Sequence, residues 1–188
     1  RVLVVHLHNT TYAFTTMLAV FLAGIAVGNA LLMRAYDRLR HPLFWLGVVE
    51  LGIGLSIVAA ATAYASLHSI GANLGITSWP RAVALMFARA GLVLLPSALL
   101  LGMTFPLVAR IVCREVGTLG RRLANVYAAN TAGAIFGSLA GGFLLVPLLG
   151  LRGTLLALSA LNIALALACW VATASGVWSR AILVALVV

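Results

Sequence analysis

The sequence predicts an all-α membrane protein, a polytopic helical bundle, and three observations lead to this class. Hydrophobic residues make up 64% of the 188 residues and charged residues only 8%, whereas a soluble domain carries about 25% charged residues. The apolar runs exceed roughly 18 residues, the length of a helix that crosses a bilayer. They also lack the alternating polarity of membrane β-barrel strands. We therefore expect most of the chain to face lipid or other apolar helices.

The expected elements follow from the alternation of apolar runs with short connections. One transmembrane domain over residues 1–188 holds spans at residues 12–33, 42–67, 82–108, 123–149 and 154–175, and a truncated span from residue 181. The arginine-rich loop Arg34–His41 separates the first two spans, and the polar segment HSIGANLGITSWPR separates the second from the third. The tight turn GLRG divides the fourth span from the fifth. The apolar run after Arg180 is shorter than the ~20 residues of a full span, so we expect the chain to be part of a longer protein.

Two prolines, Pro96 and Pro106, lie inside the third expected span. Each removes a backbone hydrogen bond from a helix. We therefore expect this helix to bend, or to end near Pro106.

The distribution of arginine predicts the orientation of the spans. All twelve basic residues are arginines, and most of them lie in short connections, above all in the loops Arg34–His41 and Arg110–Arg122. Loops rich in positive charge face the cytoplasm, so both loops are expected on that side. The net charge of +9 is therefore interpreted as a topology signal, and no nucleic-acid partner is expected.

Small residues recur at every fourth position in two of the expected spans. In the segment GRRLANVYAANTAGAIFGSLAGGFLLVPLLG they are Ala129, Gly133, Gly137 and Gly141, and in the first span Gly24 and Gly28 repeat the pattern. Residues four apart share one helical face, and helices in lipid associate through small residues that allow close backbone approach. We expect both faces to pack against other helices. A ligand-binding role for the face in the fourth span is the less favoured alternative.

Four polar residues are expected near the middle of the membrane and form a candidate intramembrane polar site. They are Glu50, Arg89, Asn130 and Asn162. Glu50 and Arg89 each lie about 12 Å from a membrane edge at ~1.5 Å per residue, in a core ~30 Å thick, so their opposite charges can pair. Gly47 and Gly54 share a face with Glu50, which indicates that Glu50 points at a packed helix. An ionisable residue at this depth suggests a functional site, and a buried pair that fixes helix register is the structural alternative.

No catalytic, cofactor-binding or metal-binding residues are expected in this chain. Cys113 and Cys169 are far apart and lack the spacing of metal ligands, so neither a metal site nor a disulfide is predicted. His6 and His8 alone provide too few ligands for a metal ion.

Four stretches of the sequence resemble a known family. They are NTTYAFTTMLAVFLAGIAVGNALL (Asn9–Leu32), LGVVELGIGL (Leu46–Leu55), LLPSALLLGMTFPLVAR (Leu94–Arg110) and GRRLANVYAANTAGAIFGSLAGGFLLVPLLG (Gly120–Gly150). In this order they resemble the membrane region of bacterial fused membrane/spermidine-synthase-like proteins. The stretches YAANTAGA and GMTFPL are the most specific parts.

The resemblance implies a fold, a location and a function. In that family the hydrophobic region is similar to half of a major-facilitator transporter and is joined to a soluble aminopropyltransferase-like domain. It implies a multi-pass protein of the bacterial inner membrane, whose first and fourth spans are equivalent helices of two three-helix repeats. A spermidine synthase also needs a Gly-rich nucleotide loop and acidic substrate ligands, and neither occurs among these 188 residues, which hold three acids. We therefore expect this region to anchor or serve a soluble domain that lies outside the chain.

Two other functions stay open. The chain can be a transporter-like half that moves a small solute, although a polyamine carrier should offer several carboxylates to its cargo. It can also be a structural subunit that packs within a larger membrane complex. The expected partners are the lipid bilayer and either the remainder of the same polypeptide or other membrane subunits.

Overall fold

The structure is a computed structural model that describes residues 2–36, 39–72, 79–112 and 119–174. All regular structure in these residues is helical, which confirms the all-α class. The helices are α1 (Val2–Ala35), α2 (Pro42–Ala72), α3 (Trp79–Val112), α4 (Leu119–Leu139), the π-helical segment η3 (Ala140–Leu145) and α5 (Val146–Ala174). The span expected from residue 181 lies outside the described residues.

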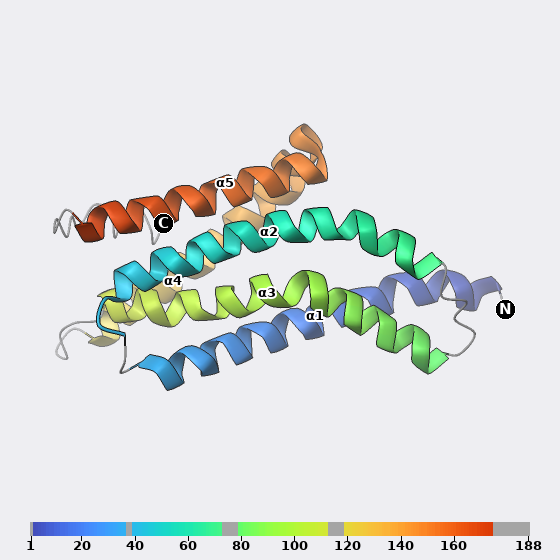
Figure 1. Ribbon diagram of the computed structural model, residues 1–188, viewed down its shortest axis with the longest axis horizontal. Coiled ribbons are helices and arrows are strands. Elements are labelled where there is room, and N and C mark those ends of the chain that lie inside the picture. The colour runs from blue at the N-terminus through green and yellow to red at the C-terminus, as the bar shows by residue number, and fades with distance from the viewer. Residues whose placement is uncertain (1, 37–38, 73–78, 113–118, 175–188) are drawn as a thin grey trace.

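Four helices in the described part are long and apolar enough to cross a membrane. They cover Phe14–Ala35, Pro42–Thr62, Val83–Val112 and Gly120–Ala174. The last has 55 residues, which corresponds to about 80 Å at ~1.5 Å per residue and exceeds the ~30 Å core of a bilayer. Its backbone leaves the helical conformation at Gly150, where φ is 70° and ψ is 171°. The chain reverses there, in the turn GLRG, so this stretch provides two crossing segments (Figure 1).

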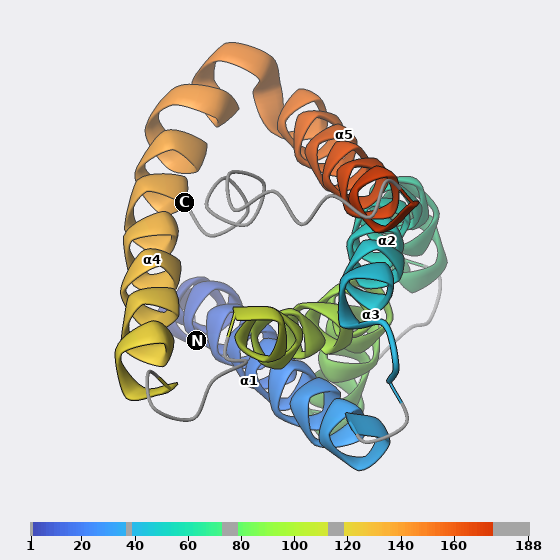
Figure 2. The same cartoon turned by 90° about the vertical axis from the view of Figure 1, so that its left-hand side faces the viewer.

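The helices pack side by side in the order α1, α3, α2, α5. The end view in Figure 2 shows these four as one continuous row, while α4 stands apart from them and returns to α5 through η3. The largest fully buried side chains are Leu46, Leu107 and Cys169, which come from α2, α3 and α5. The core therefore lies inside the row, and α4 contributes little to it.

Helix α3 continues through both of its prolines. It passes Pro96 and Pro106 and ends at Val112, so the expectation that it ends near Pro106 is wrong. Figure 1 shows that α3 is bent, as expected for a helix that loses backbone hydrogen bonds at proline. In a spanning segment, packing against neighbouring helices can maintain a helix beyond such a break.

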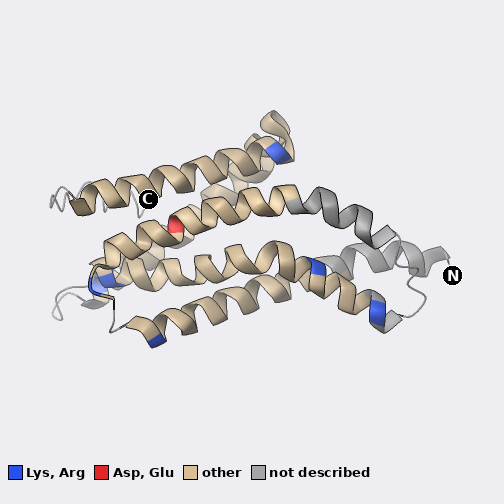
Figure 3. Cartoon of the chain, in the orientation of Figure 1, with Lys and Arg blue, Asp and Glu red and all other residues tan. Residues whose placement is uncertain are grey.

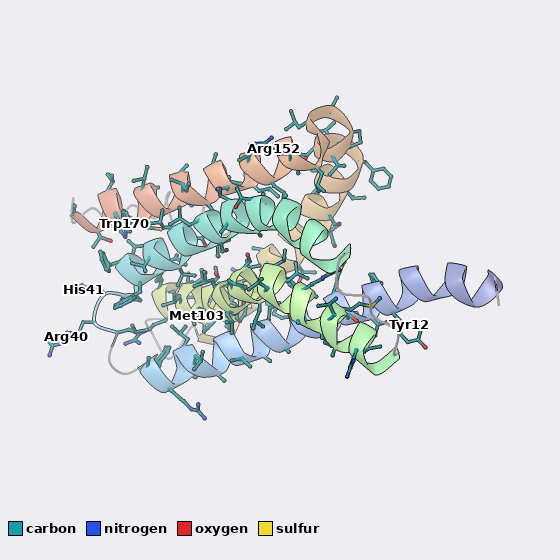
Figure 4. The ribbon with its side chains drawn as sticks, turned by 45° about the vertical axis from the view of Figure 1, so that its right-hand side comes forward. Tyr12, Arg40, His41, Met103, Arg152 and Trp170 are labelled. Carbon is teal, nitrogen blue, oxygen red and sulfur yellow. The ribbon has the colours of Figure 1, made fainter. Side chains whose placement is uncertain are left out.

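Both arginine-rich connections lie at the same end of the helices. Arg34 is in the last turn of α1 and Arg110 in the last turn of α3, and α4 starts at this end as well (Figure 3). Arg40 and His41 lie here too, while Arg152 lies at the opposite end (Figure 4). We call this end the arginine end; its described arginines are Arg34, Arg40, Arg110, Arg121 and Arg122.

Candidate functional site

The four residues of the expected polar site lie on four different helices. Glu50 is in α2, Arg89 in α3, Asn130 in α4 and Asn162 in α5. Glu50 is buried with 6% of its surface exposed, Arg89 and Asn162 are half-buried, and Asn130 is exposed. The structure therefore does not gather the four residues into one site.

Glu50 lies at the close crossing of α2 and α5. A Cβ atom added at Gly47 would lie 2.7 Å from Trp170 Nε1, and one added at Gly54 would lie 3.0 Å from the Ser159 carbonyl oxygen. Glu50 lies between these glycines in the sequence. Its side chain is buried, with 6% of its surface exposed. Glu50 thus faces a packed helix, as its glycine neighbours indicate.

No ion pair between Glu50 and Arg89 is formed in the part of the chain that the structure describes. Helix α3 packs against a different side of α2, where the hydroxyls of Ser56 and Ser97 form a hydrogen bond of 2.8 Å. The Ser56–Ser97 bond also fixes the register of these two antiparallel helices: Glu50 precedes Ser56 toward the arginine end, and Arg89 precedes Ser97 toward the opposite end. The two residues are therefore separated by ~20 Å along the helix axes at ~1.5 Å per residue, and the equal depth expected for them is wrong.

The two asparagines make different contacts. Asn162 Nδ2 donates a hydrogen bond of 2.7 Å to the Leu158 carbonyl oxygen of its own helix. Its Cβ atom would lie 3.5 Å from a Cβ added at Gly54, which places Asn162 at the crossing of α2 and α5. Asn130 has no hydrogen bond to a neighbouring helix among the described residues. Of the expected polar residues, only Glu50 and Asn162 share an interface.

The glycine face of α1 packs against α3. A Cβ atom at Gly24 would lie 2.5 Å from Ala98 Cβ, and one at Gly28 would overlap the Leu99 carbonyl oxygen. Gly102 makes the same kind of close contact from the side of α3. The two backbones therefore touch, which is the role that small residues have between membrane helices.

The glycine face of α4 has no neighbour among the described residues. A Cβ atom added at Gly133, Gly137 or Gly141 would meet nothing within 4 Å. Phe136 and Phe143, nearby in α4 and η3, are 72% and 81% exposed. The expected packing of this face is therefore not made within the described part of the chain. The reason is that α3 already buries its small residues against α1, and α4 approaches α3 only weakly.

The structure contains polar contacts between helices that the sequence did not predict. The buried hydroxyl of Ser159 donates a hydrogen bond of 2.8 Å to the Gly54 carbonyl oxygen and so links α5 to α2. The Ser56–Ser97 bond links α2 to α3. A hydroxyl inside an apolar span is a sequence signal for such a contact, because hydroxyl groups form hydrogen bonds between helices in membranes. The hydroxyl alone does not indicate which residue of which helix accepts its bond.

Side-chain to backbone bonds hold the arginine end together. Arg110 Nη1 donates to the Tyr36 carbonyl oxygen, and its guanidinium lies 4.1 Å from the centroid of the Tyr36 ring. Arg122 Nη1 donates to the Val112 carbonyl oxygen at 3.1 Å. These bonds tie the end of α1 and the start of α4 to the end of α3.

The described residues contain no group of three His, Cys, Asp or Glu side chains that could hold a metal ion. Cys169 is a free, fully buried thiol. The side chains of His6 and His8, and residue Cys113, lie outside the described residues. The prediction that the chain has no cofactor stays a prediction.

In comparisons with known proteins, no family model matches the chain, and no curated protein or solved structure is significantly similar to it. The arrangement of helices and the chemistry of the described residues are therefore the basis for the function proposed below, together with the resemblance noted in the sequence.

Proposed function

We propose that this chain is the membrane-embedded region of a spermidine-synthase-like fusion protein, and that it anchors or serves a soluble aminopropyltransferase-like domain outside the chain. The resemblance of four stretches to that family is the origin of the proposal. These stretches fall on α1, α2, α3 and α4 with the start of α5. Four helices suited to crossing a membrane are compatible with such a role.

The clustering of arginine is the structural observation that carries the proposal. The arginine end holds five described arginines, whereas Glu50, the one acidic residue within the described ranges, is buried inside α2. By the positive-inside rule this end faces the cytoplasm, which supports a location in the bacterial inner membrane. A cytoplasmic enzyme domain would then lie on the same side as this charged surface.

The test is the intact mass of the protein purified from its native membrane, with peptide sequencing beyond Arg1 and Val188. We expect additional sequence with a Gly-rich loop after a strand and an acidic residue about 20 positions further on, because an adenosyl donor requires these groups. Binding of that donor to the purified native protein should follow. A native protein that is no longer than this chain would contradict the proposal.

A role as a packing subunit is the second candidate, and the free glycine face of α4 favours it. Gly133, Gly137 and Gly141 are arranged as in helices that associate in lipid, yet they contact nothing within 4 Å among the described residues. A helix from another subunit would fill this surface.

A transporter-like half is a further alternative, and Glu50→Gln distinguishes it from an anchor. For an anchor we expect the variant to unfold within about 1 kcal/mol of the wild type, because glutamine preserves the side-chain shape and such volume-conserving changes are tolerated. Thermal unfolding in detergent measures this. The control is Arg152→Gln, which replaces an exposed residue at the end of the helices opposite the arginine end.

The same variants should be compared in proteoliposomes for uptake of a labelled polyamine. An anchor should show no uptake above that of empty vesicles with any of the three proteins. Uptake by the wild type that Glu50→Gln abolishes and Arg152→Gln preserves would instead establish the transporter-like function.

A further inference from the structure

A groove of about 460 Å³ lies between the last third of α3 and the first turns of α4. Its lining residues are Phe105, Gly120, Leu123, Ala124, Tyr127 and Ala128. The rings of Phe105 and Tyr127 meet edge to face, with centroids 6.3 Å apart. The lining from Gly120 to Ala128 extends about 12 Å along α4, at ~1.5 Å per residue. The groove is thus a short, open apolar hollow at the surface that starts at the arginine end.

Two arginines follow Gly120, the lining residue nearest the start of α4. Arg121 follows Gly120 directly and is exposed. Arg122 is held at the end of α3 by its bond to the Val112 carbonyl oxygen. The charged side chains described at this end are arginines, and Asp37 and Glu115 lie outside the described residues.

We propose that this groove binds an anionic phospholipid. One acyl chain lies along Phe105, Ala124 and Ala128, and the headgroup phosphate lies against Arg121 and the first turn of α4. Guanidinium groups bind phosphate oxygens through paired, charge-assisted hydrogen bonds, and a helix N-terminus favours an anion. Basic pockets between membrane helices hold anionic headgroups in this way.

The dimensions favour a lipid over a partner helix. A spanning helix would follow α4 through the whole ~30 Å core, whereas the groove lines only about 12 Å of it at ~1.5 Å per residue. The lining residues Gly120, Ala124 and Ala128 repeat every fourth position on one side of α4. The glycine face with Gly133 and Gly137 lies on another side of the helix at ~3.6 residues per turn. It is therefore a separate surface, and the groove needs an occupant that combines a short apolar chain with a negative charge.

The experiment is native mass spectrometry of the detergent-purified chain with phosphatidylglycerol or phosphatidylcholine at equal concentrations. We expect the wild type to retain phosphatidylglycerol preferentially. Arg121→Gln should weaken its retention about tenfold or more, since a hydrogen bond to a charged group contributes about 1.5–3 kcal/mol. Ala124→Trp, which fills the groove, should have a similar effect. Arg40→Gln changes an exposed charge at the same end and should retain the lipid.

Two further measurements test whether the acyl chain is needed for binding and whether each variant folds. Glycerol phosphate, which has the headgroup charge and no acyl chain, should neither bind in the groove nor displace the lipid. Circular dichroism verifies that each variant folds, and Ala128→Phe replaces Ala124→Trp if the latter does not. Equal retention of both lipids, equal loss in Arg40→Gln and Arg121→Gln, full retention when the groove is filled, or displacement by glycerol phosphate would each overturn the proposal.

Discussion

Gly28→Leu is expected to separate α1 from α3 and to cause the largest loss of stability among the changes considered. A Cβ atom at Gly28 would overlap the Leu99 carbonyl oxygen, and a backbone atom cannot rotate away as a side chain can. The helices must move apart, and Ala98, which is fully buried, would lose its contacts. Overpacking costs roughly 1–3 kcal/mol and occasionally more, and we expect a value at or above the upper end. Thermal unfolding in detergent measures the loss.

Gly137→Leu is the matched control, because a Cβ atom at Gly137 meets nothing within 4 Å in the part of the chain that the structure describes. It makes the same chemical change on the other glycine-patterned helix and should alter stability by less than about 0.5 kcal/mol, as for other changes away from packed sites. If the native protein assembles through α4, this variant should lower the yield of the complex without unfolding the chain. Equal destabilisation by both variants would mean that the α4 glycines pack within the chain.

Gly150→Ala is expected to destabilise the reversal between the fourth and fifth crossing segments. Its φ of 70° and ψ of 171° lie in a region that is essentially restricted to glycine, and a side chain there costs about 1–3 kcal/mol. The Thr154 hydroxyl donates a hydrogen bond of 2.8 Å to the Gly150 carbonyl oxygen. A shift of the backbone caused by alanine at position 150 would therefore also disturb the first helical turn after the reversal. A lower unfolding temperature in detergent is the expected result.

Gly91→Ala is the control for this change. Gly91 is in helix α3, and a Cβ atom at Gly91, like one at Gly150, meets nothing within 4 Å among the described residues. Alanine in a helix interior is more stable than glycine by roughly 0.5–1 kcal/mol, so the sign of the effect should be opposite. Since neither alanine meets a neighbour, the difference measures backbone conformation alone. Two variants of equal stability would show that Gly150 does not adopt this conformation.

The sequence predicts those features that depend on one helix at a time. Hydropathy locates the helices, and the turn GLRG contains Gly150, where the backbone reverses. Gly47 and Gly54 indicate the side of α2 that packs, and Glu50 lies there. Each of these depends on neighbours in the chain or on helical periodicity, which the sequence displays directly.

The candidate site was less predictable, as Glu50 and Arg89 illustrate. The expected depth is counted from the expected span edges, whereas the register of two helices is fixed by the contacts between them. Glu50 shares a face of α2 with Gly47 and Gly54, which pack against α5. The Ser56–Ser97 bond sets α3 against α2 so that Arg89 lies far along the axis from Glu50. Ser97 is not marked by a motif, so the sequence offers no signal that would set this register.

By itself, the sequence determined the all-helical class, the approximate positions of helices long and apolar enough to cross a membrane, and which of their faces carry small side chains. The observed helices α1 and α3, however, begin before and end after the expected spans. Only the tertiary structure decided that the face with Gly24 and Gly28 packs against α3, while the face with Gly133 and Gly137 meets no neighbour among the described residues. The physical reason is that apolar helices in lipid gain little from burial alone. Their pairing depends on how closely two backbones fit, and that fit joins residues far apart in the chain.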